Sequence, residues 1–203
     1  MKNLFFVLSF FILTGLLSAQ QTTGSQSMFS ASYNYEKNGD YKNAISSILK
    51  VYDKDNYFIN LRLGWLYYLS ADYNSSKKYY ESAKNICGSC SDAQLGLTLP
   101  LSMQNNWSEI VNIYKQILKK DSQNYSANLK LGQYYFNNRD YANAKIHFDK
   151  IATSLPADYE NTLYLAWTFY YLGDFTEAKE KFLVIEMLSP NDPSALEGLN
   201  LIK

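Results

Sequence analysis

The two cysteines are the residues of this sequence with the most evident capacity for chemistry. They stand three positions apart in Cys87-Gly-Ser-Cys90, and the 203-residue chain contains no other cysteine. A thioredoxin-like redox centre of this spacing needs a strand followed by a helix, and a zinc site needs two further ligands that the chain lacks. A small structural disulfide between Cys87 and Cys90 is therefore the first interpretation, with free thiols as the alternative.

The only histidine, His147, is the second candidate. It has no second histidine or spare cysteine to work with, and the sequence contains no nucleotide-binding Gly-rich loop, no GxSxG and no HExxH. We expect His147 to be a solvated residue on an outer helix. The sequence thus indicates no catalytic residue, no metal site and no cofactor, and it favours a protein that is not an enzyme.

Composition excludes further classes of protein. There are 19 Lys and Arg against 19 Asp and Glu, so the chain lacks the basic surplus typical of a nucleic-acid-binding protein. Its apolar content of 47% argues against wholesale disorder.

The first 19 residues have the pattern of a secretory signal peptide. A lysine precedes an apolar run over residues 4–17, and Leu17-Ser18-Ala19 supplies a small residue for cleavage. The run is shorter than the roughly 20 residues that a membrane-spanning helix needs, although an uncleaved anchor is the alternative. We expect export through the Sec pathway, membrane contact only before cleavage, and a periplasmic or secreted bacterial product. Residues 20–26 are expected to form a flexible lead-in.

A repeat organises the rest of the chain. Its marker is an acid or asparagine followed by an aromatic residue, with spacings of 32, 34, 34 and 34 residues, at Asp40-Tyr41, Asp72-Tyr73, Asn106-Trp107, Asp140-Tyr141 and Asp174-Phe175. Three residues later comes a mostly small position: Ala44, Ser76, Ile110, Ala144 and Ala178. Four further on stands a large one: Ile48, Tyr80, Tyr114, Phe148 and Phe182. These spacings place the side chains on one helix face, and each block is predicted to be two antiparallel helices.

This pattern of period, small positions and large positions resembles the tetratricopeptide repeat family. The resemblance implies an all-α fold, a right-handed superhelical solenoid of about five helix-turn-helix repeats over residues 27–203. The expected repeats are 25–56, 57–90, 91–124, 125–158 and 159–192, with a capping helix at 193–203. The third block departs most, because Leu97-Thr98 replaces a Leu-Gly pair and Ile110 fills the small position. Pro100 also falls inside its first helix, where we expect a kink or a shorter helix.

In the family that the chain resembles, first helices line a concave binding surface. The resemblance therefore implies that the protein binds a protein or peptide partner through an aromatic groove. The candidate partner-binding residues are Phe29, Tyr33, Phe58, Arg62, Trp65, Tyr68, Lys130, Gln133, Phe136, Tyr164, Trp167 and Tyr170. The alternative is that several of these pack between adjacent helices as core.

A second hypothesis is that the aromatic groove stacks on sugar rings, as in a glycan- or peptidoglycan-binding envelope protein. It requires hydrogen-bonding side chains beside the rings, and the candidates are Asp92, Gln133 and Glu160.

Overall fold

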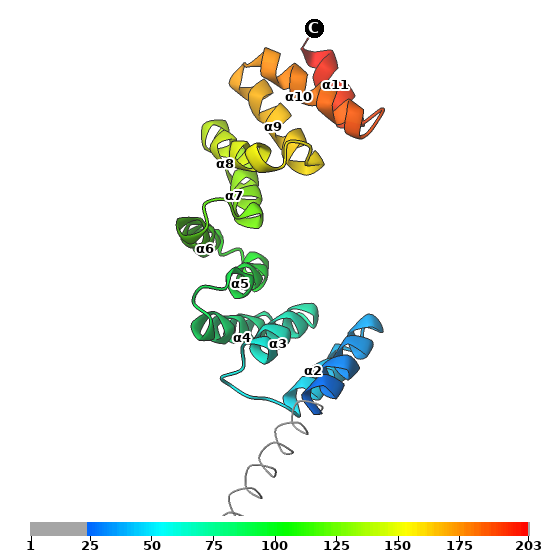
Figure 1. The fold of residues 1–203 in the computed structure, drawn as a ribbon, viewed down its shortest axis with the longest axis vertical. Helices are drawn as coiled ribbons and strands as arrows, with labels where there is room; N and C mark the ends of the chain where they lie inside the picture. Colours follow the sequence, from blue (N-terminus) through cyan, green and yellow to red (C-terminus); the bar gives the residue numbers. More distant parts are fainter. Residues whose placement is uncertain (1–23, 203) are drawn as a thin grey trace, which may run out of the picture. The chain divides into compact units, whose positions relative to one another are not determined.

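The computed structural model describes residues 24–202, and the predicted signal peptide and residues 20–23 lie outside this range. The described residues form α-helices joined by short turns, without a strand. A first helix over residues 24–37 is followed by α2 (Tyr41–Leu49), α3 (Tyr57–Leu69), α4 (Tyr73–Ile86), α5 (Ser91–Met103), α6 (Trp107–Lys120), α7 (Tyr125–Asn137), α8 (Tyr141–Ser154), α9 (Tyr159–Leu172), α10 (Phe175–Leu188) and α11 (Pro193–Leu201) (Figure 1).

The chain divides into two compact units, one ending at Asn106 and the other beginning at Trp107. Unit 1 therefore contains the helices up to α5, and unit 2 contains α6 to α11. In each unit the second helix of a repeat packs against the first helix of its own repeat and of the next, as in α3–α4–α5 and α7–α8–α9. The boundary falls inside the third predicted repeat, between its two helices.

The turn inside each repeat is built by the acid that marks it. The side chains of Asp40, Asp72, Asp140 and Asp174 each accept a hydrogen bond from the backbone amide three residues later, at 3.0–3.3 Å, and so cap the second helix. The residue before the marker has a positive φ in all five turns, at Gly39, Ala71, Asn105, Arg139 and Gly173. This left-handed residue reverses the chain between two antiparallel helices.

Packing between helices follows the predicted small and large positions. The small and large residues of all five blocks are buried, including Ile110 and Tyr114 in the third block. The Tyr80 ring lies between two glycines: a Cβ would come within 2.8 Å of it at Gly64 and within 2.2 Å at Gly96. Opposite Gly64, the small Ser76 donates a 2.8 Å hydrogen bond to the Gly64 carbonyl. Close helix approach therefore depends on the absence of side chains at these two glycines.

Buried asparagines hold the connections between repeats. The Asn60 side-chain amide donates to the carbonyls of Lys54 and Asn56, at 3.0 and 2.8 Å. Asn128 repeats the arrangement in unit 2, donating to Ser122 and Asn124 at 3.0 Å each. Each asparagine satisfies loop carbonyls that lose water when the next helix packs over them.

The shorter helix expected at Pro100, as the alternative to a kink, is wrong. Helix α5 continues through Pro100 to Met103 and is as long as α3, 13 residues. The backbone amide of Gln104 still bonds to the Pro100 carbonyl at 3.2 Å, and the proline ring is buried. At the other end, residues 24–26 of the expected flexible lead-in belong to the first helix, and Ser25 and Gln26 line a hollow together with Phe29 and Ile59.

Among residues 24–202, no helix combines the length and the apolar character needed to cross a membrane.

Candidate functional site

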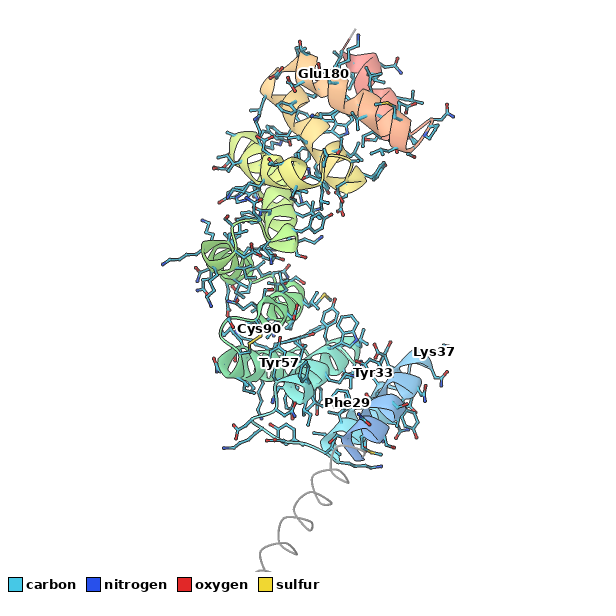
Figure 2. All side chains as sticks on the ribbon, viewed as in Figure 1. Phe29, Tyr33, Lys37, Tyr57, Cys90 and Glu180 are labelled. Atoms are coloured by element: carbon cyan, nitrogen blue, oxygen red, sulfur yellow. A yellow bond between two sulfur atoms is a disulfide. The ribbon has the colours of Figure 1, made fainter. Side chains whose placement is uncertain are left out.

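An aromatic groove of about 720 Å³ lies in unit 1, between the first helix and α3. We call it the unit 1 groove; its lining is Phe29, Tyr33, Glu36, Lys37, Tyr41, Phe58, Leu61, Arg62, Trp65 and Leu69. Tyr33 is 56% exposed and Phe58 is 68% exposed, whereas Phe29 packs partly against the core. Phe29, Tyr33 and Lys37 follow one another along the first helix (Figure 2).

The floor of the unit 1 groove is a closed polar network. Arg62 forms an ion pair with Glu36 at 2.5 Å and donates two hydrogen bonds to Ser32, at 3.0 and 3.2 Å. The Trp65 indole N–H donates to the other Glu36 oxygen at 2.6 Å. The Tyr33 ring covers the guanidinium at 3.8 Å. The charges are thus satisfied within the wall, and the aromatic rings face outward over them.

The interpretation of Arg62 as a residue that contacts the partner is corrected by this network. Its side chain is only 6% exposed, and its charge is paired with Glu36. Arg62 holds the first helix to α3 and positions Tyr33 and Trp65. The sequence analysis also missed Glu36 and Lys37, although they lie three and four residues after Tyr33 and so share its helix face.

In unit 2 the predicted aromatic residues form a packed cluster instead of an open rim. Phe136 contacts Tyr164 edge-on with ring centroids 5.3 Å apart, and Trp167 contacts Tyr170 at 5.6 Å. All four are half-buried and pack against the core. In unit 1, Tyr68 is likewise half-buried and contacts Trp65. For these residues the structure favours the alternative role, packing between helices.

The polar members of the candidate set in unit 2 bond to one another. Lys130 donates to Gln133 at 3.1 Å, and Gln133 donates to Glu160 at 2.6 Å. Lys130 and Gln133 line a second hollow of about 480 Å³ between α6 and α7, together with Trp107, Ile110, Tyr114, Tyr134, Asn137 and Asn138. The sequence analysis assigned no site to Trp107 or Tyr134. Trp107 lies in the irregular third block, and Tyr134 is not among the candidate partner-binding residues of the fourth.

Trp65 and Trp167 occupy the same repeat position but have different partners. Trp65 bonds to Glu36 in the preceding repeat, and Trp167 donates to Ser194 in the following one, at 2.8 Å. Both indoles therefore join neighbouring first helices, and Trp65 also lines the unit 1 groove.

The structure also shows the surroundings of the three residues with reactive side chains, Cys87, Cys90 and His147. Cys87 and Cys90 form a disulfide at the junction of α4 and α5. His147 is not solvated as expected: it is half-buried, and its Nδ1 lies 3.0 Å from the Asn128 side-chain oxygen. Within the described residues, no three His, Cys, Asp or Glu side chains gather as a metal site would require.

Helix-turn-helix units with a 34-residue period, close packing at Gly64 and Gly132, and acid-capped turns are the hallmarks on which the family assignment depends. The sequence profile of the tetratricopeptide repeat family matches residues 25–53, 59–90 and 125–154. The chain belongs to the tetratricopeptide repeat family. Two of the matched tetratricopeptide repeats lie in unit 1 and the third lies in unit 2.

Solved structures agree with this assignment at the level of the fold. A tetratricopeptide repeat protein from Parabacteroides merdae superposes with a TM-score of 0.73 at 18% identity, over 89% of this chain and 72% of that one. The MamA protein gives a TM-score of 0.64 at 16% identity, over 87% and 92%. YrrB, described as a tetratricopeptide repeat protein with an unusual peptide-binding site, gives 0.66 at 13%, over 91% and 97%. No curated protein matches the chain by sequence.

Proposed function

We propose that the protein is a non-enzymatic interaction module of the cell envelope that binds an extended or helical segment of a partner polypeptide in the unit 1 groove. The observation that carries this proposal is that exposed aromatic rings lie over polar side chains whose charges and hydrogen bonds are already paired. Tyr33 and Phe58 offer apolar area to a ligand, and the Glu36–Arg62 pair beneath them needs no partner from outside.

Polypeptide segments suit such a surface because aromatic rings bury large areas with few rotatable bonds. Tyr33 and Tyr41 add hydroxyl groups that can bond to a peptide backbone, and exposed Lys37 offers a cation at the edge of the groove. The family assignment supports the broader role of protein-interaction scaffold. The peptide-binding site described for YrrB makes a peptide the first ligand to test.

A sugar ligand is the less favoured occupant. Of the three side chains that were candidates for sugar binding, Gln133 and Glu160 hydrogen-bond to each other, so each already has a partner. Asp92 is exposed but does not line the unit 1 groove.

Export rests on the pattern of residues 1–19 and is part of the same proposal. Mass spectrometry of the protein isolated from its host checks it directly. Cleavage after Ala19 gives a mature chain that begins at Gln20, and an intact N-terminus in a cytoplasmic fraction contradicts export.

Photo-crosslinking in the native host tests the binding proposal. The photoreactive amino acid p-benzoylphenylalanine is placed at Phe58, in the groove, or at Met187, an equally accessible apolar residue of α10 that is 74% exposed. We expect discrete protein adducts from Phe58 and none at the same masses from Met187. Adducts to polysaccharide alone, or identical adducts from both positions, would contradict the proposal.

A further inference from the structure

The 34-residue register places Cys90 where the other first helices have a capping asparagine or aspartate. The equivalent residues are Asn56, Asn124, Asp158 and Asp192. Each accepts a hydrogen bond from the backbone amide three residues later, at 2.8–3.1 Å. Cys90 is the N-cap of α5, but its side chain accepts no such bond. Its sulfur is bonded to Cys87 instead.

A tyrosine hydroxyl completes this arrangement in unit 2. Tyr125 donates to Asp158 at 3.1 Å, and Tyr159 donates to Asp192 at 2.5 Å, each pair 33 residues apart. In unit 1, Tyr57 stands 33 residues before Cys90. Its hydroxyl oxygen is buried, and no group accepts a hydrogen bond from it. Tyr57 therefore has the position of a donor whose acceptor is missing.

The hydroxyl of Tyr57 lies at the first turn of α5. Burial raises the pKa of Tyr57, the Asp92 carboxylate adds to the rise, and the backbone amide of Ala93 acts in the opposite direction. Ala93 is the residue whose amide would bond to the cap in the other repeats. The Ala93 N–H points at the Tyr57 oxygen, so the Tyr57 O–H is the donor that lies beside the first turn of α5 without an acceptor.

We propose that Cys87–Cys90 is a thiol–disulfide exchange site for external thiols, in which Cys90 leaves as a thiolate that takes the place of the missing cap. The Tyr57 O–H would donate to that sulfur, as Tyr125 donates to Asp158. The N-terminus of a helix and a hydrogen-bond donor both stabilise a thiolate. The Asp92 carboxylate opposes the negative charge, but it is exposed and screened by solvent.

The reaction balances with two external thiols as reductant. One thiolate attacks the sulfur of Cys87, the S–S bond breaks, and its electron pair leaves on the sulfur of Cys90. The product is a mixed disulfide between the external thiol and Cys87. A second external thiolate attacks the external sulfur of that mixed disulfide and releases Cys87, which takes a proton from water. Two external thiols are oxidised to one disulfide, and the protein disulfide is reduced to the Cys87 thiol and the Cys90 thiolate, with one proton released to water.

The first test compares single-cysteine variants of the full mature chain. Thiolate absorbance near 240 nm at pH 7 is measured for Cys87→Ser, which retains Cys90, and for Cys90→Ser, which retains Cys87. We expect the thiolate fraction of Cys90 to be about fivefold that of Cys87 or more. Combining Cys87→Ser with Tyr57→Phe should reduce it, whereas combining it with Tyr125→Phe, the equivalent position in unit 2, should not. Equal thiolate fractions in the two single-cysteine variants overturn the proposal.

The second test follows exchange in the unmodified mature chain. The oxidised protein is mixed with reduced glutathione, quenched with acid, and mapped by mass spectrometry. We expect the glutathione adduct on Cys87, followed by the fully reduced protein. Adducts mainly on Cys90, or no reduction by an excess of glutathione in the folded protein, contradict the proposal. Circular dichroism of each variant separates loss of exchange from loss of folding.

Discussion

His147 stacks on Tyr135, with ring centroids 5.7 Å apart and 5° between the ring planes. Its Nδ1 donates to the side-chain oxygen of Asn128, because both amide hydrogens of that residue already bond to backbone carbonyls. The same stack occurs 68 residues earlier between Tyr79 and Tyr67, at 5.3 Å and 6°. His147 is therefore a packing residue with a titratable ring.

Acid sensitivity of unit 2 follows from this position. Burial, then the charges of Lys150 and Lys115, lower the pKa of His147 to about 4. An unfolded histidine has a pKa of about 6.5, so the unfolded chain binds a proton between pH 6.5 and 4 that the folded chain does not. The free energy of unfolding should fall as the pH drops through that window, by about 1–2 kcal/mol for a partly exposed ring.

The variant His147→Tyr tests this acid sensitivity, because Tyr79 occupies the equivalent position in an earlier repeat and a tyrosine ring does not gain a proton in this pH range. Urea midpoints at pH 7.5 and pH 4.5 measure the effect. We expect a smaller acid loss in the variant than in the native protein. The lowered pKa values of Asp40 and Asp192 add a loss of stability that begins as the pH falls into the ordinary carboxylate range, but both residues are present in the variant and in the native protein, so this loss cancels in the comparison. An unchanged acid loss in His147→Tyr would refute this role of the histidine.

The left-handed turns offer sites for stabilisation. Ala71 and Arg139 have φ values of 62° and 61°, where Gly39 and Gly173 stand in other repeats. A side chain in this conformation costs about 1–2 kcal/mol, part of which glycine returns through its greater freedom in the unfolded chain. Arg139→Gly should raise the free energy of unfolding by about 0.5–1 kcal/mol, and Gly173→Ala should lower it by about 1 kcal/mol. Thermal denaturation of both measures this, and a destabilised Arg139→Gly would be evidence against strain.

Gly96→Ala should be among the most damaging small substitutions in unit 1. Its new Cβ would lie 2.2 Å from the buried Tyr80 ring, and that ring is also held by Gly64. Overpacking of this kind costs about 1–3 kcal/mol. Gly24→Ala, with nothing within 4 Å, is the control. Chemical denaturation should show a large loss for Gly96→Ala alone, with partial recovery when Tyr80→Leu is added.

The buried ion pair should show strong coupling. Arg62→Met leaves Glu36 half-buried with only Trp65 as a partner, and losing one member of such a pair costs about 3–5 kcal/mol. Adding Glu36→Gln should restore part of that loss. A double-mutant cycle by urea unfolding measures the coupling, and strictly additive effects would show that the pair contributes nothing.

The period alone predicts much of the fold, because one side chain at each small and large position decides how the helices pack. Ile110 and Tyr114 are buried as that pattern requires. The pattern did not identify Gly96 as a packing position. Gly96 lies two positions before the usual small position of a first helix, and it contacts Tyr80 of the preceding repeat. Such contacts depend on neighbouring repeats and are invisible to a pattern within one repeat.

The site was harder to predict for a related reason. Helical spacing shows that Tyr33, Arg62 and Trp65 share a surface, but it does not show which of their polar groups are already paired with other side chains of the protein. The Arg62 side chain is buried in an ion pair with Glu36, which lies in another repeat, and is therefore not free to bind a partner. Exposure of the rings in unit 1 and their packing in unit 2 likewise depend on partners distant in sequence.

The most direct measurement of the central claim is peptide affinity for two tyrosine variants of the same helix. Peptides selected from a random library on the full mature chain are titrated against Tyr33→Ala and Tyr35→Ala. Tyr33 lines the unit 1 groove, while Tyr35 is 40% exposed and does not. We predict about tenfold weaker binding for Tyr33→Ala, as for an aromatic residue at the centre of an interface, and native affinity for Tyr35→Ala. Equal affinity of the two variants, with native circular dichroism, would contradict a peptide-binding groove in unit 1.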